Sequence, residues 1–138
     1  MSDTKQVIVM RTKYPDGNGG TFGLRKGKSI SQGAHASMAF ITRRWQWDES
    51  GSSRFNLNLS AVEQKWLEDS FAKVCLQVDT EEELLEIERK AKEAGLECHV
   101  VTDSGRTEFG GVPQKTCLAI GPDYCEKIDK ITGHLELY

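Results

Sequence analysis

Two short segments of the chain carry side chains that could do chemistry. The first is Arg25-Lys26-Gly27-Lys28, which is followed by Gln32 and His35. A helix is predicted to begin here, and a lysine at that position adds its charge to the unpaired backbone N–H groups of the helix N-terminus. Such a place can bind a phosphate or stabilise an oxyanion. On these residues alone, an ordinary surface turn explains the segment equally well.

The second segment is Asp103-Ser104-Gly105-Arg106-Thr107, which places an acid, a flexible glycine, a cation and a hydroxyl after a predicted strand. Ligands of open α/β sheets bind at the carboxyl ends of strands. This rule predicts that Arg11-Thr12 and the loop at Lys26 lie near Asp103. A plain turn is the alternative for this segment too.

Metal and nucleotide motifs are missing from the sequence. The stretch from Gly23 to Ser29 is one residue shorter than a phosphate-binding G-x-x-x-x-G-K-[ST] loop, so a nucleotide phosphotransferase is a weak alternative. The three histidines share no metal-ligand spacing, and the four cysteines form no C-x-x-C pair. We therefore expect neither a metal nor a cofactor.

The hydrophobic pattern predicts four strands and four helices. The strands are expected at 5–12, 73–79, 97–103 and 115–121. The first helix is expected at 28–45, and the other three follow capping patterns at Ser60, Thr80 and Asp123. Residues 13–23 read as a long glycine-rich loop, and residues 46–71 as an atypical insertion that opens with a loop at 46–59 and contains the short helix.

This order predicts a single α/β domain over residues 1–138. We expect a four-stranded mixed, mostly parallel sheet with helices on both faces. In the first helix, apolar residues recur at helical spacing and predict the face toward the core: Ile30, Ala34, Met38, Ile41 and Trp45. The polar residues Lys28, Gln32 and His35 are then expected to project together, away from that face.

Charge is divided unevenly along the chain. Residues 5–44 carry a net charge of +7, although the whole chain carries −3. A basic segment on an acidic body suggests an anionic partner bound at one place. No apolar run is long enough for a membrane span, and no signal peptide is evident, so we expect a cytoplasmic protein without a membrane partner.

Taken together, several segments resemble the second family of peptidyl-tRNA hydrolases. The matching stretches are 5–12 (KQVIVMRT), 24–36 (LRKGKSISQGAHA), 74–95, 103–107 (DSGRT) and 117–138, which ends in IDKITGHLELY. They stand in the family's order and cover about two thirds of the chain. The resemblance implies hydrolysis of the ester between a peptide and tRNA, with peptidyl-tRNA as the partner. It also implies a four-stranded mixed sheet and a homodimer.

The resemblance suggests roles for the residues of the two segments. Asp103 would orient or partly deprotonate a water molecule, and Lys26 would stabilise the oxyanion. Thr107 would hold the water or the ester carbonyl, and His35 is a reserve group for proton transfer. The residues expected to bind substrate are Gln32, Lys28, Arg106, Thr12 and Arg25.

Three departures from the family pattern motivate an alternative. The loop at 13–23 is longer than usual, Lys13 replaces an acid, and Glu108 stands where the family usually has glutamine. An added carboxylate could repel phosphate or raise the pKa of a neighbouring acid. The alternative function is therefore a catalytically inactive homologue that binds tRNA or another RNA.

Overall fold

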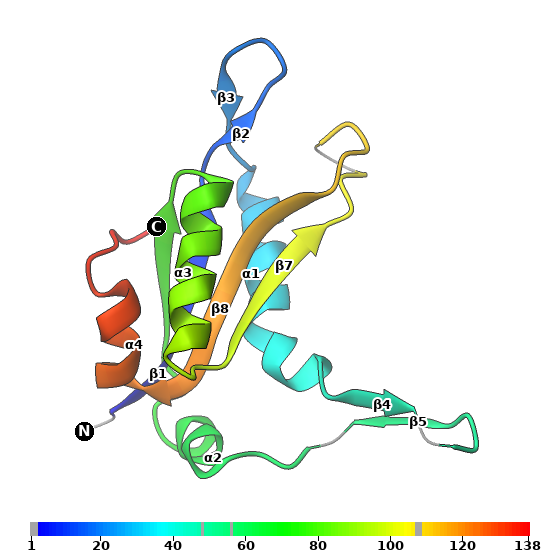
Figure 1. The fold of residues 1–138 in the computed structure, drawn as a ribbon, viewed down its shortest axis with the longest axis vertical. Helices are drawn as coiled ribbons and strands as arrows, with labels where there is room; N and C mark the ends of the chain where they lie inside the picture. Colours follow the sequence, from blue (N-terminus) through cyan, green and yellow to red (C-terminus); the bar gives the residue numbers. More distant parts are fainter. Residues whose placement is uncertain (1–2, 48, 56, 107–108) are drawn as a thin grey trace.

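The computed structural model describes residues 3–47, 49–55, 57–106 and 109–138, and these form one α/β domain around a four-stranded sheet (Figure 1). The strand order is β6-β1-β8-β7. The bounds are β1 (Thr4–Arg11), β6 (Lys73–Val78), β7 (Cys98–Asp103) and β8 (Gln114–Tyr124). The predicted mixed sheet is confirmed, with one correction. Three strands share a direction, but β8 runs antiparallel between β1 and β7, so only β1 and β6 form a parallel pair.

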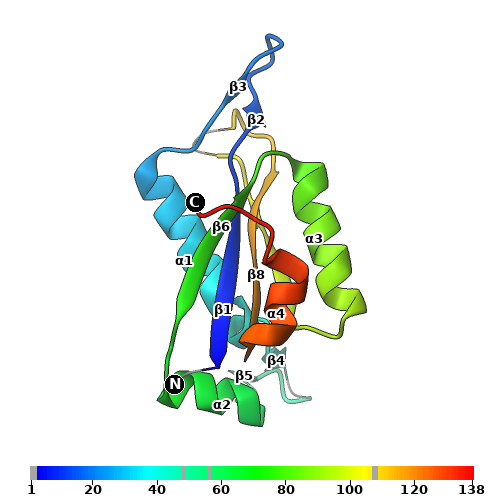
Figure 2. The ribbon, with the colours of Figure 1, turned by 90° about the vertical axis from the view of Figure 1, so that its left-hand side faces the viewer.

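Helices cover both faces of the sheet, as predicted (Figure 2). Helix α1 (Lys26–Thr42) lies on one face, and α3 (Glu81–Glu93) and α4 (Cys125–Thr132) lie on the other. The larger core is on the side of α3 and α4, where Leu84 and Ile128 pack against strand residues such as Leu118. Within the described part of the chain, no helix has the length and hydropathy needed to cross a membrane.

The orientation of α1 contradicts the predicted core face. Ile30 is 73% exposed and Met38 57% exposed, so the apolar stripe faces solvent. The buried residues of this helix are Ser29, Gln32, Ala36, Ala39 and Phe40. The core face predicted from hydrophobic spacing was wrong because the sheet surface beneath α1 also carries polar groups, and these form hydrogen bonds with Gln32. The helix also starts two residues earlier than expected and ends before Trp45.

Two segments expected to be loops each contain a short hairpin. Residues 13–23 form β2 (Tyr14–Pro15) and β3 (Thr21–Phe22), and residues 46–59 overlap β4 (Trp45–Trp47) and β5 (Ser53–Phe55). In the first hairpin, Asp16 Oδ1 accepts hydrogen bonds from the backbone N–H groups of Asn18 and Gly20. This turn holds the glycine-rich segment upright above the carboxyl end of β1 (Figure 1).

The capping patterns succeed in two of three cases. Ser60 and Glu63 form a complete capping box ahead of α2 (Ala61–Glu68). Thr80 accepts the backbone N–H of Glu83 at the start of α3. The third prediction is wrong because Asp123 belongs to β8, and α4 begins after Tyr124 without a side-chain cap.

The final residues of the chain cover the outer edge of β6. Leu137 forms an isolated antiparallel bridge with Leu76. On either side of it, the Gln77 N–H donates to the Glu136 carbonyl at 3.0 Å and the Tyr138 N–H donates to the Cys75 carbonyl at 3.0 Å. Residues 136–138 therefore satisfy backbone groups that an edge strand would otherwise expose.

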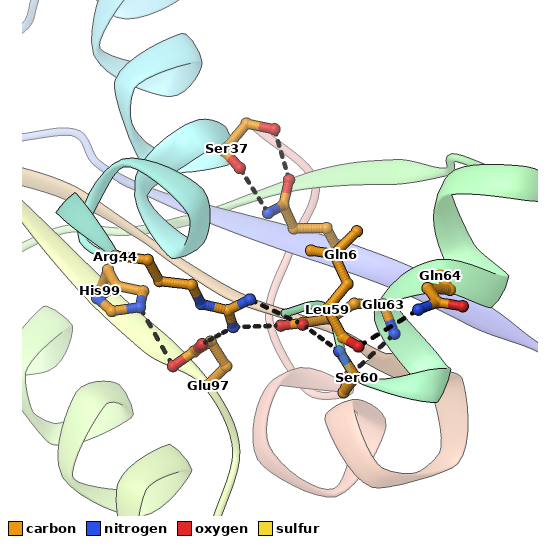
Figure 3. A network of polar contacts seen from close by, with 9 residues as sticks. All are labelled: Gln6, Ser37, Arg44, Leu59, Ser60, Glu63, Gln64, Glu97 and His99. Carbon is orange, nitrogen blue, oxygen red and sulfur yellow. Dashed lines mark hydrogen bonds and ion pairs between the residues drawn. The ribbon is translucent and has the colours of Figure 1, made fainter. Parts of the chain in front are cut away.

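At the end of the sheet away from the β2–β3 hairpin, Arg44 joins three elements (Figure 3). Its guanidinium donates to both carboxylate oxygens of the buried Glu63, at 3.1 and 2.7 Å, and to Glu97 Oε1 at 2.9 Å. Burial by itself raises the pKa of Glu63, but the bonds from Arg44 and Ser60 outweigh it and hold that pKa below its ordinary value. Two-point contact of this kind fixes the geometry between α1 and α2.

We expect Arg44→Met to lower the free energy of unfolding at pH 7 by about 2 to 3 kcal/mol, because it leaves a buried carboxylate without its partner. The pKa of Glu63 is depressed in the folded state, so its contribution is complete above the ordinary value of 4.5 and is lost as the pH falls through the folded value. Urea unfolding at several pH values should therefore show the gap from wild type shrinking below pH 4.5.

Arg43→Met is the matched control, since Arg43 is exposed and its guanidinium donates to the Val100 carbonyl, at 3.0 Å, and not to a buried carboxylate. A stability gap for Arg44→Met that did not change with pH would contradict the assigned role of Glu63.

Candidate active site

A lysine–aspartate ion pair lies where α1 begins and β7 ends. Lys28 Nζ donates to Asp103 Oδ1 at 2.8 Å. Both side chains are largely buried, with 15% and 9% of their surface exposed. Lys28 is in the first turn of α1, and Asp103 is the last residue of β7. The pair therefore joins the two segments that the sequence singled out.

Two further donors hold the Asp103 carboxylate. Gln32 Nε2 lies 3.3 Å from Oδ1, and the backbone N–H of Gly105 donates to Oδ2 at 2.9 Å. Gly105 has a φ of +83°, and a Cβ at this position would lie 2.1 Å from the Val112 carbonyl oxygen. Only glycine fits this turn, so the turn that aims an amide at the carboxylate depends on that residue.

Gln32 is itself fixed from the sheet. Its Oε1 accepts a hydrogen bond from Thr116 Oγ1, and its backbone carbonyl accepts one from Cys117 Sγ at 3.3 Å. Gln32 is only 3% exposed. The sequence predicted that this residue would orient substrate, which stays a prediction, and the structure places it between Asp103 and Thr116. In this position it orients the Asp103 carboxylate.

The surroundings keep Asp103 ionised. Burial alone raises the pKa of this carboxyl group, but the Lys28 hydrogen bond, the Gly105 N–H and the charges of Lys28 and His35 lower it further than burial raises it. The pKa of Asp103 therefore lies below its ordinary value. At neutral pH the site presents a carboxylate beside an ammonium, with the charges separated by one hydrogen bond.

The other predicted residues near the start of α1 and after β7 are mostly exposed. Lys26 is exposed at the first position of α1, and none of the ion pairs among the described residues includes it. Arg25 occupies the N-cap position of the same helix, and Arg106 is exposed in the turn after Gly105. His35 is exposed and lines a shallow pocket together with Met38 and Thr102.

The remaining residues that the sequence analysis named are Thr12, Thr107 and Glu108. Thr12 Oγ1 donates to Asp79 Oδ1 at 3.0 Å, which ties the end of β1 to the loop before α3. Thr107 and Glu108, which the sequence analysis singled out, lie outside the described residues.

Sequence reasoning missed several residues that support the site. Thr116 is completely buried, and its hydroxyl is the group that fixes the Gln32 amide. A polar residue inside an apolar strand was the available signal, but only the β7–β8 register shows that it meets α1. Ser29 Oγ lies 2.8 Å from the Tyr138 hydroxyl, so residues 136–138 also contact the first turn of α1.

The fold and this pair together define a class of protein. It is a single α/β domain with an ionised carboxylate and an ammonium at the carboxyl end of the strands. Among the described residues there is no cluster of side chains suited to hold a metal ion. The chain belongs to the peptidyl-tRNA hydrolase PTH2 family, whose model matches residues 4–138.

Curated relatives agree with this membership. A peptidyl-tRNA hydrolase of Methanocaldococcus jannaschii is 37% identical, over 96% of this chain and 98% of the relative. One from Methanopyrus kandleri is 40% identical, over 96% and 97%. A probable peptidyl-tRNA hydrolase 2 of Dictyostelium discoideum is 35% identical over the whole chain, which spans 56% of that longer protein.

A solved structure of a protein of unknown function, Atu0240 from Agrobacterium, also resembles the chain. Its TM-score is 0.53 at 14% identity, covering 100% of this chain and 99% of the other. At this identity the likeness supports the fold alone.

Replacing Lys28 by Met should raise the pKa of Asp103, because the carboxylate stays buried while it loses a charged donor. Carbon-13 NMR of the carboxyl groups, followed through an acid titration, measures this directly. Lys26→Met is the control and should leave the titration of Asp103 as in wild type. An Asp103 signal that titrates alike in wild type and in Lys28→Met would show that the pair does not control the carboxylate.

Proposed function

We propose that the chain hydrolyses the ester that joins a peptide to the 3′ end of tRNA, and that the Lys28–Asp103 pair is its reaction centre. The observation that carries the proposal is the 2.8 Å contact between these two groups in a member of this family. Hydrolysis gives a free peptide carboxylate and a tRNA that can be charged again. No described feature favours the inactive RNA-binding alternative.

Asp103 acts on the attacking water. One carboxylate oxygen accepts a hydrogen bond from the water while the water oxygen bonds to the ester carbonyl carbon and the bond to the ribose oxygen breaks. A general base works best with a pKa near the working pH, and the pKa of Asp103 lies lower than its ordinary value. Its main contribution is therefore to orient the water and to stabilise the positive charge that develops on it. The proton finally reaches the departing ribose oxygen.

Lys28 takes the role that the sequence assigned to Lys26. Its ammonium stabilises the negative charge that develops on the carbonyl oxygen or on the departing ribose oxygen. Because the side chain is mostly shielded from water, its charge acts across a lower dielectric than a surface lysine would. Gln32 and Gly105 keep the carboxylate from turning away as substrate enters.

The basic residues around the start of α1 bind the tRNA backbone. Arg25, Lys26 and Arg106 are exposed, and the positive end of the α1 dipole lies at the same end of the domain. A phosphate bound here would place the 3′ end close to Lys28. His35, Thr107 and Thr12 keep their predicted roles as candidates for proton transfer, water binding and substrate contact.

Replacing Asp103 by Asn or Lys28 by Ala should lower kcat for N-acetyl-aminoacyl-tRNA about a hundredfold, because each change removes a group that acts on the transition state. The rates are measured as release of free tRNA, with unblocked aminoacyl-tRNA as a reference substrate.

Lys26→Ala is the matched control in the same helix turn. It should keep kcat and raise KM, and it should flatten the dependence of KM on salt, since one phosphate contact is lost. Near-wild-type rates in both Asp103→Asn and Lys28→Ala would refute the proposed reaction centre. A large loss of kcat in Lys26→Ala would return the oxyanion role to that residue.

The assembly and the compartment are proposed as well. We propose a homodimer that uses the solvent-facing stripe of α1, because Ile30 and Met38 are large apolar side chains exposed on one helix face. We place the protein in the cytoplasm, where its substrate is made.

Light scattering should give twice the mass of one chain for the wild type and the mass of one chain for Ile30→Glu with Met38→Glu. Leu67→Glu is the control, since Leu67 is exposed on α2. A monomeric wild type at micromolar concentration would exclude this dimer.

A further inference from the structure

A pocket of about 460 Å³ lies between the β2–β3 hairpin and the segment that leads into β8. Pro15 and Phe22 contribute the hairpin wall, and Phe109, Val112 and Gln114 contribute the opposite wall. No role has been given to this pocket so far. It is formed by the glycine-rich segment at 13–23, which the sequence singled out as longer than is usual for the family.

Two aromatic rings line the pocket, Phe22 from the hairpin and Phe109 from the other side, and the buried Tyr14 packs behind them. Tyr14, Phe22 and Phe109 pack together, with ring centroids 4.9 to 5.9 Å apart. Tyr14 is fully buried and is anchored below by the Arg11 guanidinium, 4.3 Å from its ring centre. Tyr14 and Arg11 therefore support the rings of Phe22 and Phe109 from behind. Phe22 is only partly buried and is the ring nearest to solvent. A wall of this kind suits a flat apolar group.

The charges around the pocket argue against a phosphate. None of the described residues that line it is basic, and Asp16 brings a carboxylate to its rim. The polar group that faces the pocket is the carboxamide of Gln114. Its Oε1 accepts a hydrogen bond from Arg11 Nη1 at 3.1 Å, which orients the amide so that its NH₂ group serves as a donor.

The pocket adjoins the reaction centre. Gln114 is the cross-strand partner of Asp103, so the two side chains project from the same face of the sheet. The loop between them is closed by the Gly111 N–H, which donates to the Gly105 carbonyl at 2.8 Å, and Gly105 in turn donates to Asp103. The pocket and the Asp103 carboxylate are thus connected through one cross-strand pair and one closed loop.

We infer that this pocket binds the adenine base of the 3′-terminal nucleoside of tRNA. The inference builds on the proposed function and names the part of the substrate that the pocket holds. The base is flat, it stacks on aromatic side chains, and the NH₂ group of a glutamine can donate a hydrogen bond to its N7. All substrates share this nucleoside, whereas the amino-acid side chain on the other side of the ester differs among them.

Binding of short acceptor-stem RNAs tests the inference without any turnover. One RNA ends in adenosine, and its partner carries a terminal ribose without a base. Wild type should bind the first about 5- to 30-fold more tightly, which is the usual contribution of one stacked base. Phe22→Ala and Val112→Glu should bind both RNAs equally. Val112 is 57% exposed, so its replacement is compatible with folding even if Phe22→Ala is not.

Phe71→Ala is the control, because Phe71 is exposed and packs on Trp66 at the far end of the domain. It should keep the wild-type preference for adenosine. Equal affinity of wild type for the two RNAs would overturn the inference, whether or not the protein hydrolyses peptidyl-tRNA. Absence of hydrolysis with a retained preference would instead count against the proposed function alone.

Kinetics separate the base from its main competitor for the pocket, the amino-acid side chain. Phe22→Ala should raise KM by a similar factor for N-acetyl-glycyl-tRNA and N-acetyl-phenylalanyl-tRNA. A rise confined to the phenylalanyl substrate would assign the pocket to the amino acid and overturn the inference.

Discussion

The carboxamide of Gln32 is the contact on which the rest of the site depends. It lies between α1 and the sheet, accepting from Thr116 and donating to Asp103. A buried amide that lost these partners would incur a desolvation penalty, so α1 is held in the one rotation that satisfies them. That rotation brings Lys28 onto Asp103, and it also turns Ile30 and Met38 toward solvent. The same rotation buries Ala36, Ala39 and Phe40, so the polar contact and this smaller apolar face act together.

The ion pairs at the two ends of the domain have different roles. At one end, Arg44 pairs with both Glu63 and Glu97 and so holds α1, α2 and the start of β7 together. At the other end, Lys28 and Asp103 form a pair that stays partly accessible between the N-terminus of α1 and the loops beside it. The contacts of Arg44 hold α1 in place at one end, so the Lys28–Asp103 pair at the other end can keep its geometry while it stays partly accessible.

The sequence was a good guide to the elements and to the two segments that the Lys28–Asp103 ion pair joins. Local signals were sufficient for the four main strands and for the caps at Ser60 and Thr80, because these depend on neighbours in the chain. The sequence could not show in the same way whether Lys26 or Lys28 contacts Asp103. Both lie in the first turn of α1, and only the rotation of the helix on the sheet decides which one meets Asp103.

The other incorrect predictions concern residues whose partners are distant in the sequence. The predicted core face of α1 was wrong because its partner surface carries Thr116 and Asp103, which no periodicity within the helix can reveal. Asp123 resembled a helix cap, yet pairing with Lys5 extends β8 through it. Both the buried face of α1 and the assignment of Asp123 to β8 depend on contacts with residues that are distant in the sequence.

Both outer edges of the sheet are partly blocked, although by different means. Residues 136–138 lie along β6, and the Arg43 guanidinium occupies the Val100 carbonyl on β7. Each occupied group is one that a neighbouring chain cannot use to extend the sheet. The contacts of residues 136–138 and of Arg43 therefore disfavour the joining of two copies of this domain through one continuous sheet.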